Sequence, residues 1–220
     1  MKFLVFLGSS RVSSPPRPER LGERVALACV QHLQAHFEGV EVTLVDPLMI
    51  EQGPVFKPHF SYAAGRAPES LDALAARIGE ADGHVMVSPE YNHSMSPALA
   101  HLLNHFGSSL YGFRPSAIVT YSAGQWGGAR AAIGMRAFLS ELGCLPVSAM
   151  IHLPKAQDVL DPEGGFLLGV DAERWRGYFD RTLAQLHWWA EAAAQQRQRA
   201  DPAARSPGFT RSPAQRNAPE

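Results

Sequence analysis

The 220-residue chain is 45% hydrophobic and 19% charged, with a formal net charge of −1, a composition typical of a globular protein with one core. A broad nucleic-acid interface needs an excess of basic residues, and no apolar run reaches the length of a membrane span, so neither nucleic acid nor a membrane span is expected. Cys29 and Cys144 lie far apart and form no disulfide framework, which indicates a cytoplasmic chain.

Strands and helices are expected to alternate along most of the chain. Five apolar runs are typical of strands in a parallel sheet: 3–7, 40–45, 85–87, 117–121 and 147–151. Apolar side chains recur at helical spacing between them; Ser70 is the expected N-cap of one helix, and Ile133 is among the apolar positions of another. With a last helix from Asp171 to Ala194, the pattern predicts one α/β domain over residues 1–194, with helices on both faces of the sheet.

The segment 195–220 differs in composition from the rest of the chain. It holds five Arg and four Pro but few large apolar residues, so it cannot bury enough surface to offset the loss of chain entropy. We expect a disordered tail, and a solvated role is favoured over contact with an anionic partner.

The loops after the first, third and fourth strands form the candidate site, because open parallel sheets bind ligands beyond the carboxyl ends of their strands. The first loop is Gly8-Ser9-Ser10-Arg11. Its hydroxyls, its guanidinium and the free N–H groups of the following helix suit a phosphate, although an ordinary turn with a solvated arginine is an equal alternative. The loop lacks a GxGxxG pattern, which disfavours a Rossmann site, and it lacks the P-loop pattern of NTPases.

The third-strand and fourth-strand loops suit a planar ligand. Tyr91 and Asn92 offer an aromatic surface beside an amide that both donates and accepts hydrogen bonds. Gly124, Gly127 and Gly128 allow the main chain to approach such a ligand closely. The alternatives are a turn that is merely polar and a loop that is merely flexible.

Together the three loops resemble the NADPH-dependent FMN reductase family of flavodoxin-like quinone and flavin reductases. The first loop is similar to the family's G-S-x-R phosphate loop, Pro89-Glu90-Tyr91-Asn92 to its P-E-Y-N signature, and Ser122 to Gly128 to its S-x-G-x-x-G-G loop. The resemblance covers roughly residues 1–194. It implies a flavodoxin-like three-layer sandwich whose five-stranded parallel sheet has the order 2-1-3-4-5.

The resemblance also implies a noncovalent FMN. Ser9 and Arg11 are then expected at its phosphate, the P-E-Y-N residues at its ring, and the glycine-rich loop at the pyrimidine side of that ring. The insertion 12–19 leaves Ser13, Ser14, Arg17 and Arg20 as alternatives for the remaining phosphate ligands. The complete set of expected cofactor-binding positions is Ser9, Ser10, Arg11, Arg20, Leu21, Gly22, Pro89, Glu90, Tyr91, Asn92, His93, Ser122, Gly124, Gly127 and Gly128.

The activity that the resemblance implies is reduction of a small acceptor by NADPH or NADH. A hydride passes to flavin N5, and the electrons then pass in ping-pong order to a quinone, a flavin, an azo compound or a metal oxyanion. Because the cofactor carries this chemistry, no side chain is expected to be catalytic. The family further implies a homodimer or homotetramer with the flavin near the subunit interface.

Two other functions are weighed against this one. The first is an FMN-binding electron carrier, or a redox-sensing partner protein, without NAD(P)H turnover of its own. The second is a nucleotide-binding structural protein that has lost its flavin, which the intact P-E-Y-N motif disfavours.

Three further residues or pairs have open roles. His101 and His105 lie at helical i, i+4 spacing, but without a third ligand nearby a packed pair is favoured over a metal site. His93 is a minority candidate for contact with the acceptor. Arg130 has two equal readings, as a contact for the NADPH phosphate or as part of a charged surface.

Overall fold

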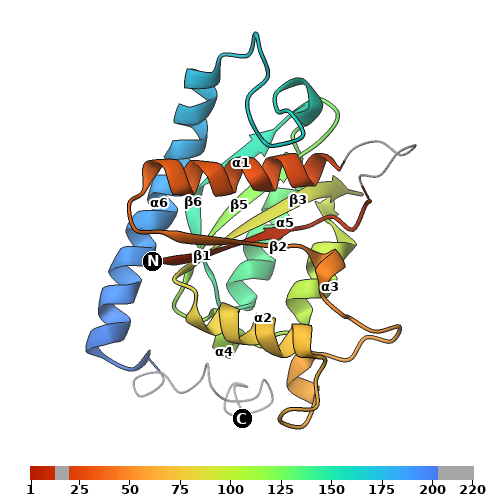
Figure 1. Ribbon diagram of the computed structural model, residues 1–220, viewed down its shortest axis with the longest axis vertical. Helices are drawn as coiled ribbons and strands as arrows, with labels where there is room; N and C mark the ends of the chain where they lie inside the picture. Colours follow the sequence, from red (N-terminus) through yellow and green to blue (C-terminus); the bar gives the residue numbers. More distant parts are fainter. Residues whose placement is uncertain (13–19, 203–220) are drawn as a thin grey trace, which may run out of the picture.

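The computed structural model describes residues 1–12 and 20–202 and contains a mainly parallel sheet (Figure 1). Five parallel strands lie in the order β2, β1, β3, β5, β6, which confirms the predicted order 2-1-3-4-5. Their bounds are Glu41–Val45, Lys2–Leu7, Gly83–Tyr91, Pro115–Tyr121 and Leu145–Leu153. A short sixth strand, β4 (Ser94–Met95), pairs antiparallel with β3 and was not predicted.

Helices cover both faces of the sheet and give the predicted three layers. One face is covered by α1 (Leu21–His36) and α6 (Ala172–Arg199). The other is covered by α2 (Glu69–Glu80), α3 (Pro97–Asn104), α4 (Ser108–Tyr111) and α5 (Ala129–Glu141). Three 3-10 turns lie in the connections: η1 (Pro47–Met49), η2 (His59–Ser61) and η3 (Ala156–Asp158).

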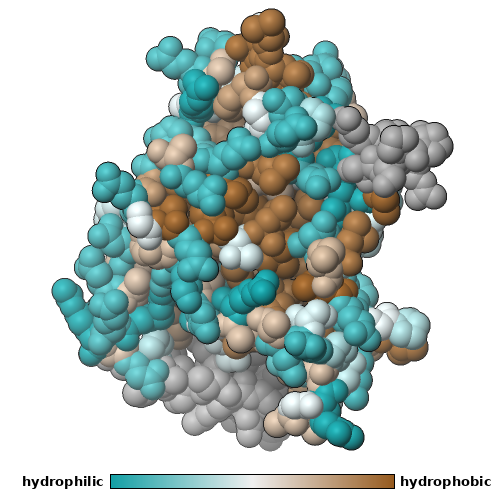
Figure 2. Space-filling view, viewed as in Figure 1, coloured by the Kyte–Doolittle hydropathy of each residue, from teal (hydrophilic) through white to brown (hydrophobic). Residues whose placement is uncertain are grey.

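Strand β1 shows why the sequence folds this way. Val5 packs into the core under α1 and α6, whereas its neighbour Phe6 packs into the core on the opposite face. Successive side chains of a strand point to opposite faces, so a central strand covered on both sides needs an unbroken apolar run. Strand β2 forms one edge of the sheet. Figure 2, drawn in the view of Figure 1, shows apolar side chains at the surface near the middle of the molecule.

Several local expectations were wrong. Helix α2 begins at Glu69 after Pro68, and the Ser70 hydroxyl accepts a hydrogen bond from the Glu51 N–H (2.8 Å) instead of capping the helix. Ile133 is 67% exposed, because its position on α5 faces away from the sheet.

Helix α6 is longer than expected at its carboxyl end. It starts at the expected cap, where the Asp171 carboxylate accepts from the Arg174 N–H, but it continues past Ala194 to Arg199. The start of the expected tail is therefore helical, and the tail from residue 203 lies outside the described residues. No helix in the described ranges is long and apolar enough to cross a membrane.

Candidate functional site

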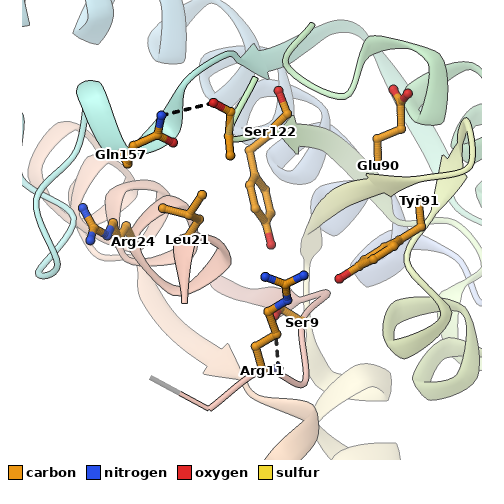
Figure 3. Close-up of a pocket in the computed structure, with 10 residues that line it drawn as sticks. Ser9, Arg11, Leu21, Arg24, Glu90, Tyr91, Ser122 and Gln157 are labelled. Atoms are coloured by element: carbon orange, nitrogen blue, oxygen red, sulfur yellow. Dashed lines mark hydrogen bonds between the residues drawn. The ribbon is translucent and has the colours of Figure 1, made fainter. Parts of the chain in front are cut away.

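A pocket of about 770 Å³ opens at the carboxyl ends of β1, β3 and β5, where the three sequence motifs meet (Figure 3). Volumes of this size suit a cofactor or a drug-sized ligand. The lining residues come from five segments of the chain: Ser9, Arg11, Leu21, Arg24, Glu90, Tyr91, Tyr121, Ser122, Ala123 and Gln157.

The loop after β1 brings a hydroxyl and a guanidinium to one end of the pocket. Gly8 donates its N–H to the Val87 carbonyl (2.7 Å), and a Cβ on Gly8 would lie 2.4 Å from that oxygen, so only glycine fits there. The buried Ser9 hydroxyl then accepts from the Arg11 N–H (3.3 Å). Figure 3 shows the Arg11 guanidinium beside Ser9, pointing into the middle of the pocket.

Arg20 supports this loop from behind. Its guanidinium binds the Asp46 carboxylate in a forked pair (2.5 and 2.8 Å) and also donates to the Ser9 carbonyl. The Arg20 side chain is 3% exposed, and Asp46 balances its charge. Arg20 was expected at the phosphate, but it does not line the pocket, because the carboxylate at the end of β2 holds it against the main chain.

The first turns of α1 form the next part of the wall. Leu21 lines the pocket as expected, and Gly22 lets α1 pass close to the Tyr121 hydroxyl. Arg24, one turn into the helix, lines the pocket and donates to the Leu160 carbonyl (2.8 Å). Ser13, Ser14 and Arg17, the alternative phosphate ligands, lie outside the described residues.

The P-E-Y-N motif lies in a hairpin and not in a simple loop. Pro89, Glu90 and Tyr91 belong to β3, and Asn92 and His93 form the turn to β4. Both turn residues have positive φ (49° and 64°), the backbone of a tight hairpin turn. Tyr91 is 41% exposed and lines the pocket, whereas Asn92 and His93 do not line it.

Glu90 joins the hairpin to the glycine-rich loop. Its carboxylate pairs with the Arg130 guanidinium (2.6 Å) and accepts from the Arg130 N–H (3.2 Å) at the start of α5. The same guanidinium lies over the Trp126 ring, 5.8 Å from its centre. Arg130 thus belongs to a charged cluster with Glu90, and a contact with the NADPH phosphate stays a prediction.

The loop after β5 is braced by the chain that leaves β6. The Ser122 hydroxyl donates to the Gly124 carbonyl (2.8 Å) and accepts from the Gly127 N–H (2.9 Å). Lys155 N–H donates to the Gly124 carbonyl, and the Gln157 amide donates to Ala123. Gly127 and Gly128 both have positive φ and close backbone neighbours, so they shape the loop without lining the pocket.

The expected positions therefore divide into two groups. Six line the pocket: Ser9, Arg11, Leu21, Glu90, Tyr91 and Ser122. The other nine are not among the lining residues: Ser10, Arg20, Gly22, Pro89, Asn92, His93, Gly124, Gly127 and Gly128.

Sequence reasoning missed four lining residues: Arg24, Tyr121, Ala123 and Gln157. Tyr121 ends β5 immediately before the glycine-rich loop, which is the one signal that could have marked it. Burial raises the pKa of Tyr121, Tyr91 adds to the rise, and Ser9, Arg20 and Arg11 oppose it. Its hydroxyl is therefore neutral and able to donate a hydrogen bond at any physiological pH.

The remaining candidate groups lie away from the pocket. The His101 and His105 rings are 5.2 Å apart and pack around Phe56. In residues 1–12 and 20–202, no group of three or more His, Cys, Asp or Glu side chains is arranged to hold a metal ion. Cys29 and Cys144 are buried, and burial raises the pKa of each thiol to about 12.

The sheet order and the position of the pocket define a flavodoxin-like α/β protein. Residues 1–158 match the NADPH-dependent FMN reductase family, and the chain belongs to that family. Its fold is similar to that of FerB, a flavoenzyme NAD(P)H:(acceptor) oxidoreductase from Paracoccus denitrificans. The TM-score is 0.62 at 22% identity, over 86% of this chain and 97% of that one.

Two relatives are more similar in sequence. An NADPH azoreductase from Bacillus sp. (strain OY1-2) is 32% identical over 123 residues, which cover 56% of this chain and 64% of the azoreductase. A quinone reductase from Escherichia coli (strain K12) is 30% identical over 128 residues, which cover 56% of this chain and 65% of the reductase. The chain thus spans slightly less than two thirds of these curated relatives.

Proposed function

We propose that the chain binds FMN in this pocket and uses NAD(P)H to reduce quinones or related small acceptors. The observation that carries the proposal is the convergence of the three motifs on one pocket: Arg11 and the buried Ser9 at one end, and Tyr91, Glu90 and Ser122 at the other. Family membership and the names of the azoreductase and quinone reductase relatives support it.

The residues present fit the phosphate end of FMN. Arg11 and Arg24 supply positive charge, Ser9 supplies a hydroxyl, and α1 begins beside them with its N–H groups. A guanidinium and a helix N-terminus are the groups that proteins commonly use for a phosphate. Gly22 lets the first turn of α1 pack against the Tyr121 hydroxyl, which a Cβ would meet at 2.4 Å.

The opposite end fits a flat ring with polar edges. Tyr91 offers an exposed aromatic face, and the Ser122–Ala123 main chain runs along the pocket. The loop's own hydrogen bonds to Gly124 and Gln157 hold it in place before a ligand arrives. Pro89, Asn92, His93, Gly127 and Gly128 would shape this end through their backbone conformation.

FMN, when bound, supplies the transfer of two electrons from the nicotinamide to the acceptor. The chain's residues bind and orient: Arg11 and Ser9 fix one end, and the Glu90–Arg130 pair fixes the hairpin against the glycine-rich loop. The exposed Tyr91 leaves the ring end open to solvent, so that the two substrates would use it in turn, in ping-pong order. The proposal includes a cytoplasmic homodimer or homotetramer.

Steady-state kinetics test this function. Protein loaded with FMN should oxidise NADPH or NADH when a benzoquinone is added, and double-reciprocal plots at several quinone concentrations should be parallel. FMN-loaded protein that oxidises neither nicotinamide with any quinone, azo dye or ferric chelate would contradict the proposal. Stable flavin binding without turnover would favour the electron-carrier alternative.

A further inference from the structure

The Tyr121 hydroxyl occupies an unusual position at the bottom of the pocket. Tyr121 is the last residue of β5, and its side chain is 5% exposed and packs in the core under α1 and α6. It nevertheless lines the pocket, so the ring is core while the hydroxyl reaches the cavity wall. Buried tyrosine hydroxyls normally have a polar partner, and the Ser9 side chain is the hydrogen-bonding group beside this one.

Gly22 makes that position possible. A Cβ on Gly22 would lie 2.4 Å from the Tyr121 hydroxyl oxygen and 3.0 Å from both Tyr121 Cζ and Leu7 Cδ1. Real side chains do not approach so closely, so α1 can begin over the hydroxyl only where its second residue lacks a side chain. Gly22 and Tyr121 lie far apart in the sequence, and together they bring the phenol of Tyr121 against the first turn of the 16-residue helix α1.

The groups around this hydroxyl favour an anion. Burial raises the pKa of Tyr121 overall, while a hydrogen bond with the Ser9 side chain and the charges of Arg20 and Arg11 act in the opposite direction. The phenol therefore stays neutral and donates its proton in a hydrogen bond, without adding negative charge. Asp46 pairs with Arg20, whereas Arg11 lines the pocket and brings positive charge to this end.

We propose that the Tyr121 hydroxyl, packed beside Gly22 at the pocket wall, donates a hydrogen bond to the terminal phosphate of the flavin and makes the site specific for a phosphorylated flavin. The inference rests on the proposed function and adds to it the residue that distinguishes FMN from riboflavin. A donor aimed at a dianion discriminates strongly, because a charge-assisted hydrogen bond is stronger than a neutral one.

Titration of flavin-free protein with FMN and with riboflavin, followed by flavin fluorescence, tests the inference. Tyr121→Phe should raise the Kd for FMN about tenfold or more and change the Kd for riboflavin less than twofold. Tyr111→Phe is the matched control: Tyr111 is a fully buried tyrosine in the opposite core, and within the described residues its hydroxyl has no hydrogen-bond partner. Both flavins should bind the control variant as they bind the wild type.

A second pair of variants tests the close contact between Gly22 and the Tyr121 hydroxyl. Gly22→Ala should weaken FMN binding by displacing the hydroxyl, and Gly22→Ala combined with Tyr121→Phe should bind FMN no worse than Tyr121→Phe alone, because the closest contact has been removed. Additive losses, or equal losses for FMN and riboflavin, would overturn the inference and leave Tyr121 a packing residue. Wild-type protein that binds neither flavin would instead overturn the proposed function. Thermal melting of each variant confirms that it is folded.

Discussion

The two ends of the pocket are built differently. At the β1 end, the arginine of the supporting pair is buried: Arg20 is 3% exposed and its partner Asp46 is 22% exposed. At the β3 and β5 end, the arginine is the exposed partner: Arg130 is 48% exposed, whereas Glu90 is 8% exposed. The difference suits a cofactor that stays bound by one end while substrates come and go at the other.

The largest effect expected at neutral pH concerns the Arg20–Asp46 pair. Asp46→Asn removes the carboxylate that pairs with the buried Arg20 guanidinium, and breaking a buried pair typically costs about 3 kcal/mol of the free energy of unfolding. Urea denaturation measures the loss. Glu80→Gln, which breaks the exposed pair with Lys2, is the control and should change the stability little. Equal losses for both variants would show that the buried Arg20–Asp46 pair contributes no more to stability than the exposed Lys2–Glu80 pair.

The second prediction concerns His84, a buried histidine in the core. His84 is fully buried, and burial beside Arg114 and Arg197 lowers its pKa to about 3. Unfolding raises this pKa to about 6.5, so the unfolded chain binds a proton below pH 6.5 and the folded chain does not. Stability should therefore fall by about 1.4 kcal/mol for each pH unit between 6.5 and 3. His84→Leu should flatten this dependence in urea titrations at pH 7 and 5.5; a slope that survives the substitution belongs to other groups.

A third prediction addresses the open end. Trp126 is exposed on the glycine-rich loop and held under Arg130, so it offers a surface on which aromatic acceptors can stack. Trp126→Ala should raise the KM for a naphthoquinone about fivefold and leave the KM for ferricyanide unchanged. Trp188→Ala removes an equally exposed tryptophan from α6 and should change neither value. A uniform change for both acceptors would show that Trp126 only shapes the loop.

The smallest expected effect concerns the Glu90–Arg130 pair. Arg130→Gln should lower kcat with quinones about twofold to threefold while leaving the Kd for FMN within twofold, because the pair supports the ring end and Arg130 is its solvent-exposed partner. Arg136→Gln, which removes a guanidinium further along α5, is its control. A large loss of FMN affinity in Arg130→Gln would place Arg130 among the cofactor's anchors.

Local apolar runs predicted the layers, and the three motifs predicted the segments that meet at the pocket. The strand order followed from the family resemblance and not from any local pattern. Distant partners could not be predicted. Nothing near Arg20 indicates that Asp46 will hold it, and nothing near Gly22 indicates Tyr121, since the sheet order brings both pairs together.

Local capping was also ambiguous at two places. Ser70 has the composition of an N-cap, but Pro68 already opens the helix and the hydroxyl binds Glu51 instead. The P-E-Y-N segment was expected to be a loop, yet Asn92 and His93 adopt positive φ and return the chain as β4. That short hairpin depends on the pairing of β4 with β3, and the Asn-His dipeptide alone does not predict this pairing.

A visible spectrum of the purified protein, taken before and after anaerobic addition of NADPH, tests the central claim most directly. We predict flavin bands in the blue that bleach when the nicotinamide is added and return when a quinone follows. Protein that stays colourless after incubation with FMN, or flavin bands that persist with both NADPH and NADH, would contradict the proposed activity of this pocket.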